Sequence, residues 1–237
     1  MLRKFWLTVI AVMGISGICI ASDNAVQIKD LKLQLELTHA PDISYNNYKA
    51  FAPKTPSVNK WVMLRVEFVP ERKRASEYVS VKNVKVSVPA WADDVKLDAK
   101  VLFDTGMVRG GKKYVLFTGK TVFWSIRQDG EKHLALMFIP AKQIDRYFVP
   151  VSGSKVSAKS FKAVVEMSAG GKVLKRAFYD VTGGTDAVRM RNFDKLAAQS
   201  PKIADAVISR SRSPWALLAP DNFDLEKDAN GMGVTQE

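Results

Sequence analysis

The side chains that most often carry out chemistry in proteins are scarce in this chain. Its 237 residues contain two histidines, His39 and His133, and one cysteine, Cys19. The two histidines lie far apart in the sequence, in or beside alternating apolar segments, and no carboxylates cluster around either of them. No HExxH sequence, calcium-binding loop or nucleophile elbow occurs. We therefore predict no metal and no cofactor, and we interpret both histidines as ordinary strand residues.

Acidic residues suggest a second chemistry, the paired carboxylates of a glycoside hydrolase. Asp93 and Asp94 stand beside Trp91, and Asp145 lies in a later segment. A hydrolase of this kind needs two carboxylates at a fixed separation in space, and the sequence does not establish one. We predict that the protein is not an enzyme.

Basic residues form the more prominent pattern. Lysine and arginine total 36 against 24 acids, which gives a formal net charge of +12. If the basic clusters shared a face, they would bind a polyanion such as DNA, an acidic glycan or lipopolysaccharide. The alternative is that they keep strand edges soluble. A tryptophan in a connecting segment could either anchor a partner or hold its loop on the core. The predicted binding residues are Arg72, Lys73, Arg74, Arg189, Arg191, Arg210, Arg212 and Trp215.

The first 21 residues have the pattern of a signal peptide. Arg3 and Lys4 precede an uncharged apolar run of 16 residues, Phe5–Ile20, and Ala21 offers a small residue for cleavage. The run is shorter than the roughly 20 residues that span a bilayer, although an uncleaved anchor is the alternative. We expect export to the periplasm, the outer membrane or the surface of a bacterium. The mature chain would then hold no cysteine and no disulfide.

Most of the chain between residues 22 and 184 repeats its apolar residues at every second position, which is typical of half-buried strands. The clearest examples are Leu31–Leu37 and Val62–Phe68. The valines change phase near Lys82 and Asn83, which a β-bulge would explain. We predict about eight short strands and a mainly β fold, an immunoglobulin-like β-sandwich with a short C-terminal helical appendix. A barrel is the alternative.

After residue 184 the apolar period lengthens to that of amphipathic helices. One helix is expected after Thr185, a second after Ser200 and a brief third after Ser213, because each of these residues can cap a helix. The last 17 residues hold five acids and one lysine, so the basic body could bind them. The predicted organisation is a signal peptide at 1–21, a β-sandwich domain at 22–184, a helical appendix at 185–220 packed on the sandwich or on a partner, and an acidic, flexible tail at 221–237.

Two stretches carry a resemblance to a known family. They are the segment from His39-Ala40-Pro41-Asp42 through Trp61-Val62-Met63-Leu64-Arg65-Val66-Glu67-Phe68, and Arg212-Ser213-Pro214-Trp215-Ala216-Leu217-Leu218. Together they resemble the pilus-associated immunoglobulin-like secreted proteins of Verrucomicrobia, the group that contains Akkermansia, over about two thirds of the mature chain. The resemblance implies a surface or periplasmic sandwich that is related to archaeal-type pilus subunits and is able to self-associate.

The leader lacks the pattern of a pilin, which favours an accessory role over that of a filament subunit. We therefore expect a non-catalytic structural or adaptor protein of the bacterial envelope. Its expected partners are pilus or envelope-assembly proteins, or a second copy of the chain. The alternative is a binding module for acidic polymers at the cell surface.

Overall fold

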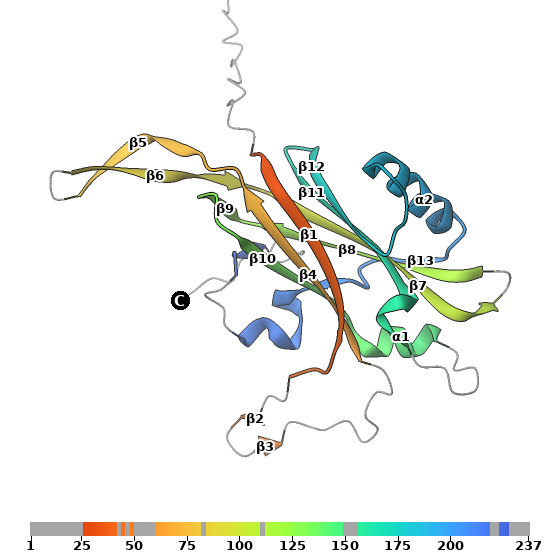
Figure 1. Cartoon of the computed structure of the whole chain (residues 1–237). Coiled ribbons are helices and arrows are strands. Elements are labelled where there is room, and N and C mark those ends of the chain that lie inside the picture. The colour runs from red at the N-terminus through yellow and green to blue at the C-terminus, as the bar shows by residue number, and fades with distance from the viewer. Residues whose placement is uncertain are drawn as a thin grey trace, which may run out of the picture.

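The computed structural model describes residues 26–41, 44–45, 48–49, 60–81, 84–109, 112–148, 156–218 and 223–227. The predicted signal peptide and most of the tail lie outside these residues, so the predictions made for them are not addressed by the structure. The described chain forms two packed β-sheets, with a two-stranded ribbon that extends beyond them (Figure 1).

The first sheet has the strand order β1-β4-β10-β14, and all of its pairs are antiparallel. Its strands are β1 (Ile28–Thr38), β4 (Trp61–Pro70), β10 (His133–Ile139) and the short β14 (Ile208–Ser209). Successive side chains of a strand point to opposite faces, and β4 shows this clearly. Val62, Leu64, Val66 and Phe68 are fully buried, while the residues between them are partly exposed. The predicted alternation is confirmed here.

The second sheet has the order β12-β11-β7-β8-β13, and β15 also pairs with β8. These strands are β12 (Lys172–Tyr179), β11 (Phe161–Ala169), β7 (Lys96–Arg109), β8 (Lys112–Phe123), β13 (Lys202–Ile203) and β15 (Glu226–Lys227). Aromatic rings from its inner face fill the core, and the rings of Phe103 and Phe161 stack with centroids 4.9 Å apart. On its outer face the carboxylate of Glu166 forms salt bridges with Lys100 Nζ at 3.0 Å and with Arg176 Nε at 3.2 Å.

The topology is that of an immunoglobulin-like sandwich. Among the strands of the two packed sheets, β1, β4 and β10 correspond to strands A, B and E of an immunoglobulin-like sandwich and lie in one sheet. The other sheet runs β12, β11, β7 and β8, which correspond to G, F, C and C′. The predicted mainly β sandwich is confirmed. The expected count of about eight strands is too low. Some segments that we predicted as one strand form two strands in the structure, and several short strands were not predicted. The hairpin of β2 (Ser44–Tyr45) and β3 (Tyr48–Lys49) is one example.

The predicted bulge falls on Lys82 and Asn83, which lie outside the described residues. On either side of them, β5 (Arg74–Val81) and β6 (Val84–Asp93) pair as antiparallel strands of a hairpin, with Val81 opposite Val84. This hairpin is the ribbon that reaches beyond the sandwich (Figure 1). Near the sandwich, β6 pairs with β9 (Ser125–Gln128) instead. A change of valine phase fits both a bulge and a hairpin with a two-residue turn.

Helices are few among the described residues. Pro140 immediately precedes α1 (Ala141–Tyr147). The longer α2 (Asp186–Ala198) begins where predicted, and its Val188 N–H donates to the Thr185 hydroxyl at 3.4 Å. It packs on the outer face of the second sheet through the fully buried Phe193. Short 3-10 turns occupy Ala158–Ser160, Arg210–Arg212 and Pro214–Leu217.

The helix expected after Ser200 does not form. The chain runs instead along β8 as β13, and the Val207 N–H donates to the Thr118 carbonyl at 3.2 Å. Gly119 makes this path possible, because a Cβ atom at that position would lie 1.8 Å from the Val207 carbonyl oxygen. Packing against the sheet edge has overridden the local capping signal.

Candidate functional site

The basic turn at residues 72–74 joins β4 to β5 and is tied to the β6–β9 pair by its backbone. Lys73 donates from its N–H to the Gln128 carbonyl at 3.0 Å, and its own carbonyl accepts from Ala90 at 2.8 Å. Arg72 and Arg74 are exposed, while Lys73 is half-buried. The structure thus presents two of the three predicted cations to solvent on an anchored turn.

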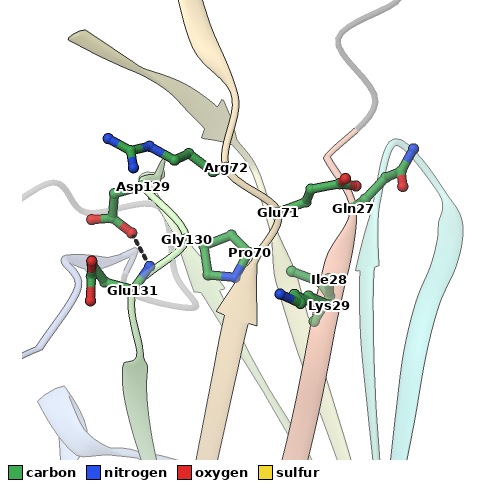
Figure 2. A pocket seen from close by; sticks show the side chains of 9 residues that line it. All are labelled: Gln27, Ile28, Lys29, Pro70, Glu71, Arg72, Asp129, Gly130 and Glu131. Carbon is green, nitrogen blue, oxygen red and sulfur yellow. Dashed lines mark hydrogen bonds between the residues drawn. The ribbon is translucent and has the colours of Figure 1, made fainter.

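Beside this turn lies an open groove of about 540 Å³ between the start of β1, the end of β4 and the turn that precedes β10 (Figure 2). Its lining carries three carboxylates, from Glu71, Asp129 and Glu131, against the cations Lys29 and Arg72. A polyanion that approached Arg72 from this side would meet these acids. The full lining is Gln27, Ile28, Lys29, Pro70, Glu71, Arg72, Asp129, Gly130 and Glu131.

The arginines of the helical region are not gathered on one face. Arg189 and Arg191 belong to α2, which packs on β8 and β11 of the second sheet, whereas the Arg210–Arg212 turn contacts β10 of the first sheet. The Arg189 guanidinium lies 5.7 Å from the Phe178 ring centroid. Arg191 and Arg212 are exposed.

Arg210 is bound within its own region of the chain. One of its terminal nitrogens donates to the Trp215 carbonyl at 3.1 Å and to the Ala216 carbonyl at 2.7 Å. Its guanidinium also lies 4.2 Å from the Phe223 ring centroid. These contacts hold the guanidinium against the protein.

Trp215 lies half-buried against the first sheet. Its ring stacks on Phe138 with centroids 4.2 Å apart, and it meets Trp61 edge-to-face at 5.3 Å. The two stretches that carry the family resemblance therefore meet in space through Trp61 and Trp215. Aromatic contacts of this kind fasten the 3-10 turn to the sandwich.

His133 is held between two carboxylates, an arrangement that no pattern in the sequence indicates. Its Nδ1 lies 2.8 Å from an Asp224 oxygen, and its Nε2 lies 3.2 Å from an Asp129 oxygen. The ring stacks on Phe68 at 5.3 Å, and the side chain is only 11% exposed. A neutral imidazole has one N–H and the imidazolium has two, so this arrangement favours the charged form.

The pKa of His133 follows from these contacts. Burial alone would lower it, but the hydrogen bonds and charges of Asp224 and then Asp129 outweigh burial and raise the pKa above its usual value. Three or more acidic, histidine or cysteine side chains that could hold a metal ion do not come together anywhere among the described residues.

An exposed apolar surface lies near the same C-terminal chain. Trp91 is 61% exposed, Trp124 is 51% exposed and Leu225 is 76% exposed; we call these three residues the tryptophan surface. Trp91 stands opposite Arg127 in the β6–β9 pair, and the Trp124 N–H donates to the Leu225 carbonyl at 3.0 Å. Exposed tryptophans beside arginine are typical of residues that dominate binding energy at protein interfaces.

The described residues thus define an immunoglobulin-like β-sandwich. No family model and no curated protein matches the sequence. A crystal structure of a protein from Akkermansia muciniphila has a TM-score of 0.61 to this chain at 14% sequence identity, and it covers 86% of this chain and 94% of its own. At that identity the likeness shows the fold. Within the described residues, no helix combines the length and apolar character needed to cross a bilayer.

Proposed function

We propose that this protein is an exported, non-catalytic adaptor of the bacterial envelope that acts through protein–protein contacts, in association with a type IV pilus-like assembly. The tryptophan surface gives the strongest support. Two tryptophans and a leucine exposed to half or more of their area would gain free energy from burial against a partner. The sandwich fold shared with a protein of Akkermansia muciniphila agrees with the bacterial group of the sequence resemblance.

In-cell photo-crosslinking tests this function. A photoreactive phenylalanine derivative replaces Trp91 in one variant and Lys172, an exposed residue of β12, in a control variant. We expect adducts with pilus or envelope-assembly proteins, or with a second copy, from position 91 and not from position 172. The same adducts from both positions, or none from position 91, would contradict the proposal.

The second candidate function is binding to an acidic polymer, and the exposed Arg72 and Arg74 favour it. Retention on immobilised DNA or heparin should then fall with salt, with a slope that decreases by about one for each phosphate that the protein no longer neutralises. The double variant Arg72→Gln/Arg74→Gln should elute earlier than a double variant of two exposed lysines elsewhere, Lys142→Gln/Lys202→Gln. Equal elution of the two double variants would exclude this turn as the polymer site.

A further inference from the structure

The outer edge of β8 is covered by the protein's own C-terminal chain. β13 pairs with β8 at Leu116 and Phe117, and β15 pairs with it at Val122 and Phe123. We call residues 223–227 the C-terminal segment. It closes a strand edge that could otherwise accept an added strand.

Each of the four residues 223–226 contacts a group elsewhere in the protein; we call these groups the receiving groups and the rest of the protein the body. Asp224 meets His133 at 2.8 Å, and two residues later the Glu226 carboxylate accepts from the Ser211 N–H at 2.9 Å. The remaining two contacts are the Phe223 ring under the Arg210 guanidinium at 4.2 Å and the Leu225 carbonyl, which accepts from Trp124 at 3.0 Å. The body therefore recognises an aromatic residue, two carboxylates two positions apart, and the backbone between them.

The receiving groups are held in place by the sandwich itself. His133 stacks on the fully buried Phe68 in the first sheet. Arg210 is held by two carbonyls of the following 3-10 turn, Pro214–Leu217, and Trp215 of that turn stacks on Phe138. The C-terminal segment is attached through a two-residue strand and individual side-chain contacts, and its Leu225 side chain is 76% exposed. This is the relation of a preformed site to a peptide ligand.

We propose that the β8 edge beside His133 is a docking site for an extended acidic segment of a partner protein, with the pattern aromatic–Asp–apolar–Glu, and that residues 223–227 occupy it in the unbound protein. Such a partner would add a strand to β8 and place its carboxylates on His133 and Ser211, as strand-addition ligands do. The inference deepens the proposed adaptor function and rests on it for the nature of the partner.

Docking at this site takes up protons. The pKa of His133 is raised for the reasons given above, and burial raises the pKa of Glu226 although Ser211 and Arg210 oppose the rise. Both groups bind protons more tightly when the segment is docked, so docking strengthens as pH falls toward 6. The charged groups around His133 are Asp129, Arg127 at 4.0 Å from Asp129, Asp224, and the neighbouring Lys132, which pairs with Glu67 at 3.3 Å.

A peptide with the sequence of residues 221–230 and a fluorescent label tests the site by anisotropy at pH 6. The protein is the full chain with Asp224→Asn/Glu226→Gln, which weakens its own segment. We expect this variant to bind the peptide at least tenfold more tightly than the wild type, whose own segment competes. The matched control Glu36→Gln/Asp194→Asn removes two exposed acids elsewhere and should bind as the wild type does.

Two further measurements identify the contacts. A peptide with asparagine and glutamine in place of the two acids should bind at least tenfold more weakly. His133→Phe added to the weakened variant should reduce the dependence on pH to the part that the glutamate of the peptide contributes. Equal binding of the two peptides, or no binding to the weakened variant at 1 mM peptide, would overturn the site. If the double variant does not fold, Glu226→Gln alone provides the same comparison.

The test uses purified components, so its failure is distinct from failure of the adaptor function, which the in-cell crosslinking measures. A concentration-dependent dimer of the wild type that disappears in Asp224→Asn/Glu226→Gln would assign the site to a second copy. That result would overturn the assignment to another protein.

Discussion

Replacement of His133 by phenylalanine should destabilise the protein at pH 6 more than at pH 9. Phenylalanine retains a flat ring for the stack on Phe68 but has no hydrogen-bonding nitrogen. Its introduction removes the contacts with Asp224 at 2.8 Å and with Asp129 at 3.2 Å. Both carboxylates lose the cation between them.

The expected magnitude follows from what each carboxylate retains. Asp129 still accepts from the Glu131 N–H at 2.9 Å, so the bond to Asp224 is the larger loss. A hydrogen bond to a charged group contributes about 1.5–3 kcal/mol to stability. We expect a loss of about 2 kcal/mol in the free energy of unfolding at pH 6, which lowers the melting temperature of a chain of this length by about 4–8 °C.

The dependence on pH follows from the raised pKa of His133. A group whose pKa is raised in the folded state stabilises that state fully below its unfolded pKa, about 6.5 for histidine. The stabilisation is lost as pH rises through the folded pKa. The difference between wild type and His133→Phe should therefore be largest near pH 6 and should shrink by pH 9.

Thermal unfolding followed by circular dichroism at the two pH values is the assay. His39→Phe is the control, because His39 is exposed beyond the end of β1. Its replacement should change the melting temperature by no more than about 2 °C, which corresponds to the roughly ±0.5 kcal/mol of an ordinary surface substitution. An equal drop in melting temperature at pH 6 and pH 9 for His133→Phe would refute the assignment of a charged imidazolium between the two acids.

Three further predictions concern stability, each measured by urea unfolding. Gly119→Ala should cost at least about 3 kcal/mol, because the new Cβ would overlap the Val207 carbonyl oxygen and the chain beside β8 would have to move; an unchanged midpoint would contradict this path. Trp215→Ala should cost about 3 kcal/mol because its ring no longer packs on Phe138, whereas the exposed Trp91→Ala should stay within about 0.5 kcal/mol. Burial alone would raise the pKa of Glu166, but its two cations lower it, so Glu166→Gln should cost about 1 kcal/mol at pH 7, and this cost should disappear as pH falls through the lowered pKa of the wild-type carboxyl; a cost that does not decline as the solution is acidified would contradict the pairing.

Alternation in the sequence predicted the sandwich because burial of one sheet face leaves a period of two that no other element shares. It could not predict that β5 and β6, on either side of residues 82–83, pair with each other. A bulge and a two-residue turn shift the apolar residues by the same parity, and only the pairing of Val81 with Val84 distinguishes them. Similarly, the capping residue Ser200 predicted a helix, but the edge of β8 offers backbone hydrogen bonds that the local pattern does not record.

The site was less predictable because its parts come from distant segments. Asp129 lies only four residues before His133, but the second partner, Asp224, is 91 residues away in the sequence, and no local pattern relates the two. Basic clusters in the sequence predicted exposed cations, and Arg72, Arg74, Arg191 and Arg212 are exposed. The same clusters do not indicate that Arg210 donates hydrogen bonds to nearby carbonyls. A cation's availability depends on its neighbours in the fold.

The docking of the acidic C-terminal segment is determined by local groups and not by the net charge of the body. At physiological ionic strength, charges more than about 8 Å apart are largely screened, so the formal charge of +12 acts on the segment mainly through direct neighbours. Those neighbours are an imidazole, a backbone N–H and a strand edge. Lys227 of the segment even pairs with Asp94 of the body, the reverse of what the overall charges predict. A site built in this way selects single carboxylates two residues apart on an extended chain, which a polymer with a continuous line of phosphates or sulfates does not present.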